Sequence, residues 1–186
     1  MAIPPNHSTS HAKIALAPDY LFSETDSDME SQTPLILERE SLYITLNGLD
    51  NDETQFHWEL YLWKDLAAKS DDIGKYFHAT DRNSPHKLWY EDARNPDIRG
   101  AINVRVALNI AIVKPAHWDR LGELLSEVSV HASTTCRTWV LEALKVLDEE
   151  GIVKLKDDGV KSIERECLKY ARTWERVIEQ SNHCKF

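Results

Sequence analysis

The sequence predicts a single α+β domain, in which an antiparallel sheet of about five strands packs against helices in the C-terminal part of the chain. Two observations predict this class. Segments rich in β-branched and aromatic residues, the clearest of which alternates along the chain, follow one another as far as Pro115. Beyond Pro115 the apolar residues recur at helical spacing. Strands that precede helices in this way favour a sheet with the helices segregated beside it.

Length and composition are those of one globular domain. The chain has 186 residues, of which 42% are hydrophobic and 28% charged, enough for one sizeable core and too few for two ordinary domains. The formal net charge is -9 and no basic stripe is visible, so nucleic acid is not an expected partner. No apolar run approaches the roughly 20 residues that a membrane span needs, so no membrane partner is expected.

The cysteines and the N-terminus predict a reduced, cytoplasmic protein. Cys136, Cys167 and Cys184 are an odd number, which does not suit a disulfide scaffold. The N-terminus does not show the basic start and the following apolar block that are typical of a secretory signal. The oligomeric state is left open by the sequence.

Residues 1–38 are expected to form a mostly disordered leader, and residues 39–186 the folded domain. The leader is rich in Pro, Ser, Thr and Asp and has no hydrophobic period. Within it, the patch Ile14 to Leu16 and the pair Tyr20-Leu21 could dock locally onto the domain.

Five segments are predicted to be strands, namely residues 41–49, 54–64, 74–81, 87–93 and 100–113. The second alternates most clearly, so that its two faces differ. Phe56, Trp58, Leu60 and Leu62 share one face, and His57, Glu59, Tyr61 and Trp63 share the other. The second face is polar and aromatic, which makes it the candidate site for binding and chemistry.

Three helices are predicted, over residues 116–130, 136–151 and about 158–181. Gly151 suits the C-terminal end of the second helix. The buried stripe of the second helix is Trp139, Val140, Ala143, Leu144 and Leu147, and that of the third is Ile163, Cys167, Tyr170, Trp174 and Val177.

Cys136 opens the second helix and is the candidate nucleophile. Ser133, Thr134 or Thr135 can cap that helix, and its free backbone N–H groups and dipole favour negative charge there. A thiol in this position has a lowered pKa, which makes it usable as a nucleophile near neutral pH. The same N–H groups could hold an oxyanion. Helical spacing aligns Cys136 with Trp139, so its sulfur is expected to face the sheet. The alternative is a core cysteine that only packs.

His57 and His78 are the candidate base and orienting group. An imidazole, with an ordinary pKa of about 6.5, can share a proton with a thiol. If the strands over residues 54–64 and 74–81 pair as a hairpin, the two histidines are cross-strand or diagonal neighbours. His78 could then orient the ring of His57, as the third group of a catalytic triad does. Glu59 is an alternative orienting group. Taken alone, His57 would be interpreted as a partly exposed and packed strand residue.

The remaining candidates are weaker. The candidate substrate-binding residues are His131, Thr135, Glu59, Tyr61, Trp63 and Trp89. A zinc site of His57, His78 and Cys136 is conceivable, because three protein ligands plus water is a catalytic zinc pattern. Nothing in the spacing matches a metal motif, so no metal and no other cofactor is expected.

Three segments, "FHWELYLWK", "GKYFHATD" and "TTCRTWVLEAL", resemble the circularly permuted branch of the NlpC/P60 papain-like superfamily. There the histidine strand comes first, a polar residue on the next strand follows, and the cysteine helix comes last. The segments look closest to a group of small uncharacterised fungal proteins with a "HW" strand and a "CRTWV"-like helix. The resemblance covers roughly residues 41–147.

This resemblance implies a papain-like fold, with Cys136 as nucleophile, His57 as base and His78 as orienting group. It implies hydrolysis of an amide or ester, or acyl transfer through a thioester, on a small-molecule or peptide-like substrate. Two other functions stay open. One is a non-catalytic binding domain with an idle site, in which Trp63, Trp89 and Tyr90 would line a groove. The other is a histidine-based acid–base enzyme, a cyclase or isomerase, that makes no use of the thiol.

Overall fold

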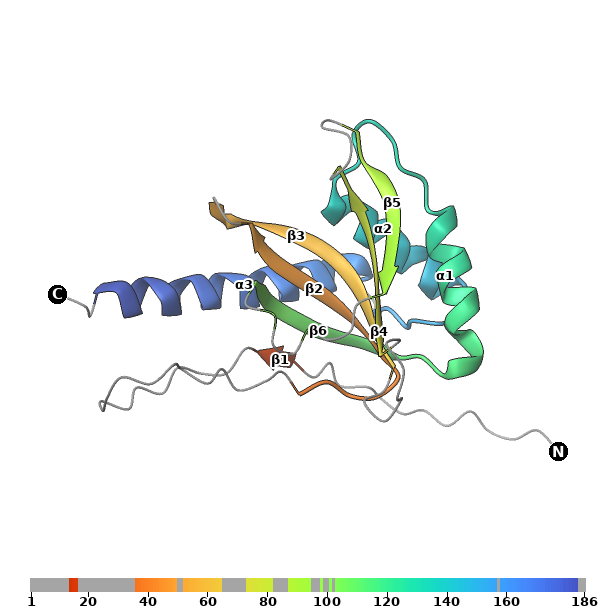
Figure 1. The fold of residues 1–186 in the computed structure, drawn as a ribbon, viewed down its shortest axis with the longest axis horizontal. Helices are drawn as coiled ribbons and strands as arrows, with labels where there is room; N and C mark the ends of the chain where they lie inside the picture. The colour runs from red at the N-terminus through yellow and green to blue at the C-terminus, as the bar shows by residue number, and fades with distance from the viewer. Residues whose placement is uncertain are drawn as a thin grey trace.

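The computed structural model of the protein describes residues 14–16, 36–49, 52–64, 73–81, 87–94, 98, 101, 103–156 and 158–183. Figure 1 shows the arrangement of the elements. The strands are β1 (Ile14–Leu16), β2 (Ser41–Leu49), β3 (Asp52–Trp63), β4 (Gly74–Thr80), β5 (Trp89–Arg94) and β6 (Val104–Ile112). A 3-10 turn (Pro115–His117) leads into the helices α1 (Trp118–Glu127), α2 (Cys136–Glu149) and α3 (Val160–His183).

The six strands form one antiparallel sheet in the order β1-β6-β2-β3-β4-β5. The predicted α+β class is therefore confirmed, with the strands first and the helices after them (Figure 1). The extra strand, β1, comes from the predicted leader and pairs with β6, so the apolar patch Ile14 to Leu16 does dock. The pair Tyr20-Leu21 and the rest of residues 1–35 lie outside the described residues.

The main core lies between the helices and the face of the sheet that carries the even-numbered residues of β3. Trp58, Leu60 and Leu62 are buried there as their alternation predicts. Cys167 of α3 is fully buried in the same core, as predicted for a member of the apolar stripe of that helix. The helical stripe facing these strands is buried as predicted and consists of Trp139, Val140, Ala143, Leu144 and Leu147.

The opposite face of β3 is also covered, which the sequence did not predict. Tyr61 and Trp63 are 0% and 1% exposed and belong to a second core. The other buried members of this core are Tyr43, Ile98, Val104 and Ala107. The assignment of Tyr61 and Trp63 to substrate binding, and of Trp63 to an aromatic groove, was therefore wrong. Strand alternation separates two faces, but it does not tell whether a distant segment covers the second one.

The helix ends differ from the predicted ones by a few residues. The helix expected over 116–130 starts as a 3-10 turn and ends at Glu127, because Val128 is extended. The helix expected over 136–151 runs over Cys136–Glu149, and Gly151 has a positive φ of 76° just beyond it, as a glycine at a helix C-terminus does. The side chains of Trp174 and Val177, and Cys184, lie outside the described residues.

The feature that positions the candidate site is a split in the sheet between β3 and β4. The two strands pair from Trp63 with Gly74 to Leu60 with Phe77, and their register ends there. Beyond that point β3 continues along β2, whereas β4 continues along β5. Figure 1 shows the two strands close at one end and spread apart at the other, with α2 behind them. Helix α2 packs against both strands, and Cys136 at its N-terminal end contacts Phe56, on the part of β3 beyond the last β3–β4 pair.

None of the helices in the described part of the chain combines the length and the apolar character that crossing a membrane requires.

Candidate active site

Cys136 is the first residue of α2, and a reciprocal cap fixes that end of the helix. The Thr135 hydroxyl accepts a hydrogen bond from the backbone N–H of Thr138 at 3.1 Å, and the Thr138 hydroxyl accepts one from the backbone N–H of Thr135 at 2.8 Å. This is a capping box with threonine at both positions. Helical geometry leaves the N–H groups of Cys136 and Arg137 without acceptors in a preceding turn. Thr135 therefore holds the start of the helix, and its predicted role in substrate binding stays a prediction.

Replacing Thr135 by alanine should lower the free energy of unfolding by about 1 kcal/mol, because one backbone N–H of α2 loses its acceptor. The melting temperature should fall by about 2–4 °C, as is typical for a chain of this length. Thr173→Ala is the matched control, since Thr173 is an exposed threonine inside α3. Equal melting temperatures for the two variants would contradict the role of the cap.

The sulfur of Cys136 faces the edge of β3 that β4 has left. Phe56 and Trp58 lie on β3 beyond the last β3–β4 pair, and their backbone groups on that edge face α2 instead. The Cys136 thiol donates to the backbone carbonyl of Phe56 at 3.9 Å, and the backbone of Trp58 also hydrogen-bonds the sulfur. The sulfur is half-buried and faces the sheet, as the helical spacing predicted.

His57 lies beside this sulfur, close enough for each side chain to shift the pKa of the other. Burial disfavours the charged imidazole, but the hydrogen bonds to Cys136 and Glu59 outweigh it and raise the pKa of His57 to about 9. Burial likewise opposes the thiolate, but hydrogen bonds from His57 and from backbone groups leave the pKa of Cys136 below its ordinary value. The two shifts favour the same state, an imidazolium beside a thiolate.

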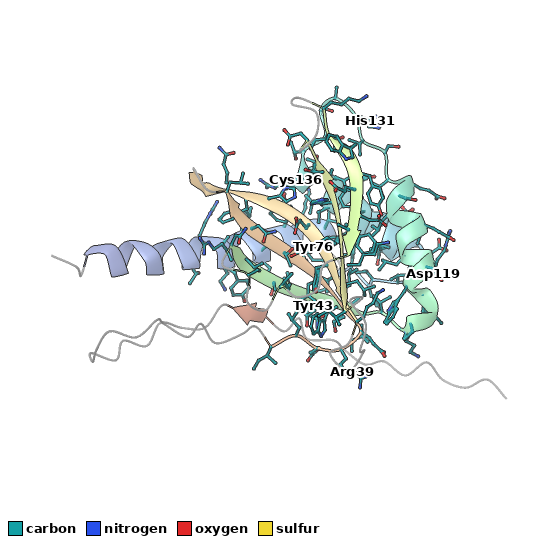
Figure 2. All side chains as sticks on the ribbon, in the orientation of Figure 1. Arg39, Tyr43, Tyr76, Asp119, His131 and Cys136 are labelled. Atoms are coloured by element: carbon teal, nitrogen blue, oxygen red, sulfur yellow. The ribbon has the colours of Figure 1, made fainter. Side chains whose placement is uncertain are left out.

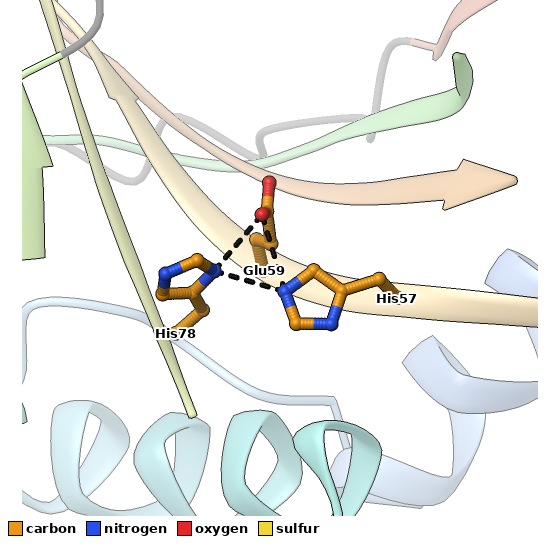
Figure 3. Close-up of side chains that lie close together, drawn as sticks. All are labelled: His57, Glu59 and His78. Carbon is orange, nitrogen blue, oxygen red and sulfur yellow. Dashed lines mark hydrogen bonds and ion pairs between the residues drawn. The ribbon is translucent and has the colours of Figure 1, made fainter. Parts of the chain in front are cut away.

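The other ring nitrogen of His57 joins a buried polar cluster of His57, Glu59 and His78, shown in Figure 3. His57 Nε2 lies 2.9 Å from His78 Nδ1 and 3.2 Å from Glu59 Oε1, and His78 Nδ1 lies 3.0 Å from the same oxygen. Continuing the β3–β4 register by one pair would put Glu59 opposite His78 and His57 on the diagonal. The predicted proximity of the two histidines is thus confirmed. With Nε2 occupied in this way, Nδ1 is the nitrogen left for Cys136.

Glu59 is the anion of this cluster, and its side chain is only 8% exposed. Burial alone would raise the pKa of this carboxyl, but hydrogen bonds from His57 and His78 lower it to about 2. Glu59 Oε2 accepts from Asn47 Nδ2 at 2.8 Å and from the Thr45 hydroxyl at 3.4 Å. Glu59 therefore contacts both histidines and is held from behind by β2. The sequence offered it only as an alternative orienting group.

Three neighbours of the cluster were not among the sequence candidates. Asn47 and Thr45 come from β2, where they pair with His57 and Glu59. Glu91 comes from β5, pairs with His78, and brings its Oε2 to 3.7 Å from His78 Nε2. The register of the β2–β3 hairpin would have identified Asn47 and Thr45, but the predicted strand bounds did not determine that register.

Two predicted substrate-binding residues lie apart from the cluster. His131 is exposed on the loop before α2 and lines a hollow of about 600 Å³ together with Thr134 and Thr138. Figure 2 places it towards the same end of the molecule as Cys136, but neither Cys136 nor either histidine of the cluster lines that hollow. Trp89 is half-buried at the start of β5, opposite Thr80.

Among the described residues, one group of side chains has ligand atoms close enough together to hold a metal ion. It consists of His57, Glu59 and His78. Cys136 is not part of that group. The arrangement can thus act chemically in two ways: as a thiol paired with a supported imidazole, and as a set of nitrogen and carboxylate ligands.

Comparison with known proteins shows one relationship. Residues 39–178 match a family described as a family of unknown function, DUF6914. No curated protein and no solved structure shows a significant match. Because the match spans the whole sheet from β2 onward and nearly all of the helical layer, the chain belongs to the DUF6914 family.

Proposed function

We propose that the protein is a cysteine-dependent hydrolase or acyltransferase, with Cys136 as nucleophile and His57 as its base. One observation carries the proposal: the sulfur of Cys136, at a capped helix start, lies beside an imidazole whose far side is held by a buried carboxylate. A nucleophile, a base and a group that orients the base are the parts that nucleophilic catalysis needs. The order of strand histidine, next-strand histidine and helix cysteine also agrees with a permuted NlpC/P60 papain-like protein.

The mechanism follows from this geometry. The Cys136 thiolate attacks the carbonyl carbon of an amide, ester or thioester, and the N–H groups at the start of α2 stabilise the oxygen that becomes negative. The tetrahedral intermediate collapses as His57 gives its Nδ1 proton to the leaving amine, alcohol or thiol, which departs. Water, or an acceptor alcohol or amine, then gives a proton to His57 and attacks the thioester. The acid or the transferred acyl product leaves, and Cys136 is a thiolate again.

In this scheme Glu59 orients the ring of His57 and stabilises its protonated form, and His78 contacts both residues. A carboxylate on Nε2 fixes the ring with Nδ1 towards the sulfur and stabilises the imidazolium, which is the role of the acidic member of a triad. This assigns to Glu59 the part that the resemblance gives to His78.

An activated ester tests the proposal without knowledge of the substrate. Mixing the protein with p-nitrophenyl acetate should release a burst of one equivalent of p-nitrophenol and leave an acetyl group on the peptide that contains Cys136. Cys136→Ala should show no burst, and His57→Gln a much slower one. Cys167→Ala is the matched control and should behave as the wild type, because Cys167 is buried in the main core.

Absence of the burst from the wild type, or a burst that survives in Cys136→Ala, would overturn the proposal. The second result, together with a loss of the burst in His57→Gln, would favour the alternative of a histidine acid–base enzyme. That alternative has one specific observation behind it, since His57, Glu59 and His78 contact one another independently of the sulfur.

A further inference from the structure

The cluster of His57, Glu59 and His78 brings together three polar atoms whose close contacts hydrogen atoms alone satisfy poorly. The three distances between His57 Nε2, His78 Nδ1 and Glu59 Oε1 are 2.9, 3.0 and 3.2 Å, and Figure 3 shows the atoms converging. The carboxylate brings no hydrogen. If one nitrogen carries one, the other turns its lone pair towards the carboxylate. If both nitrogens carry one, two polar hydrogens meet inside the same triangle.

We propose that His57 Nε2, His78 Nδ1 and Glu59 Oε1 bind a divalent transition-metal ion of the Zn²⁺ type. A cation at this place attracts the lone pairs of all three atoms at once. Ligand atoms about 2.0–2.1 Å from a tetrahedral Zn²⁺ are about 3.3 Å from one another. The three atoms therefore need to separate by only a few tenths of an ångström. Two histidines and one carboxylate, with a fourth position open, form a known donor set for zinc.

The surroundings of these three residues fit ligands rather than a simple hydrogen-bonded triad. Metal ligands are commonly oriented by outer partners on their second polar atom. Glu59 Oε2 accepts from Asn47 Nδ2 at 2.8 Å, and His78 Nε2 lies 3.7 Å from Glu91 Oε2. That Glu91 oxygen is buried and makes no hydrogen bond within the described part of the chain. A metal on Nδ1 would fix the hydrogen of His78 on Nε2, where this carboxylate can accept it.

Charge and access favour the same conclusion. Glu59 and Glu91 place two carboxylates around the histidines, and the nearby Lys75 is paired with Asp92 instead. The side chain of His57 is 22% exposed, whereas those of Glu59 and His78 are 8% and 6% exposed. His57 is thus the most exposed of the three residues, and an ion would reach the triangle from its side.

The ligand set has a consequence for the base, and this part of the inference rests on the proposed function. A neutral imidazole that binds a metal through Nε2 carries its hydrogen on Nδ1. His57 would then have no lone pair with which to take a proton from a thiol or from water. Metal binding would hold the thiol enzyme inactive, and chelation would release it. The binding itself does not depend on Cys136, whose sulfur lies on the Nδ1 side of the ring.

A zinc titration of the chelator-stripped, full-length chain tests the site. Zinc is added in competition with a chromophoric indicator, and the wild type is compared with Glu59→Gln. The wild type and Glu59→Gln contain the same histidines, so the site is measured by the one equivalent of Zn²⁺ by which the wild type exceeds Glu59→Gln. Asn47→Ala, which removes only an outer partner of Glu59, should lower the zinc affinity of this site by about tenfold or more. Mg²⁺, which prefers oxygen ligands, should not displace it.

Two controls make the outcomes decisive. Cys136→Ala should keep the full equivalent, and so should His131→Gln, which removes an exposed histidine. Equal zinc binding by the wild type, Glu59→Gln and Asn47→Ala would overturn the inference, and loss of the equivalent in Cys136→Ala would overturn this ligand set. Circular dichroism of the metal-free variants shows that each is folded. A failed acylation burst in the chelator-stripped protein, together with intact zinc binding on titration, would overturn the proposed function and leave the metal site standing.

Discussion

Replacing His57 by glutamine should slow the alkylation of Cys136 by iodoacetamide at pH 6 by about tenfold or more. In the wild type, hydrogen bonds from His57 and from backbone groups lower the pKa of Cys136 against the effect of burial, so a larger fraction of this thiol is ionised at this pH than of an ordinary cysteine. Glutamine keeps a polar side chain there but removes the positive charge. The thiolate fraction then falls, and the higher nucleophilicity of a more basic thiolate offsets only part of that loss.

The shape of the pH profile separates this ion pair from a general change in access. The two proteins should converge above about pH 9, because the pKa of His57 is about 9 and the wild type loses its imidazolium there. Rates are measured by mass spectrometry of the peptides, with chelator present. Cys167 serves as an internal control, since burial raises the pKa of its thiol. His131→Gln should match the wild type. A constant ratio of rates from pH 5 to pH 10 would contradict the ion pair.

The sequence was sufficient for the order of the elements and for the main core, because both follow from local patterns. The period of two in β3 and the helical period after Pro115 each indicate which residues of one segment share a face that packs against the core. Coverage of the second face of β3 was not predictable in this way. It depends on Ile98 and Val104, from a segment about forty residues later in the chain. For the same reason Tyr61 and Trp63 were assigned to a binding face although they are buried.

The candidate site was predictable where it depended on strand parity and on a helix start. The alternation placed His57 and Glu59 on one face, and the polar run before Cys136 contained the cap that Thr135 provides. Which group supports His57 was not predictable, because it depends on where β3 and β4 separate. The register ends just before Glu59, so Glu59 and His78 bring their polar atoms together beside His57 instead of packing as an ordinary cross-strand pair.

Acid should remove a contribution on the order of 3 kcal/mol that ionised Glu59 makes to the free energy of unfolding. Burial works against the charged form, but hydrogen bonds from His57 and His78 lower the pKa of the folded carboxyl from 4.5 to about 2. A group with a depressed pKa stabilises the folded state fully above the unfolded pKa, and this effect is lost as the pH falls. The contribution should therefore be complete above about pH 4.5 and disappear as the pH approaches 2.

The difference in unfolding free energy between the wild type and Glu59→Gln measures this contribution, because other titrating groups largely cancel in it. Urea unfolding of both proteins with chelator present should give a difference that is constant from pH 5 to pH 6 and shrinks steadily below about pH 4.5. Glu142→Gln, which removes an exposed carboxylate on α2, corrects for the loss of one surface charge. If the difference stayed constant down to pH 2.5, Glu59 would not be the buried anion of the cluster. The support that Glu59 gives to His57 would then lose its basis.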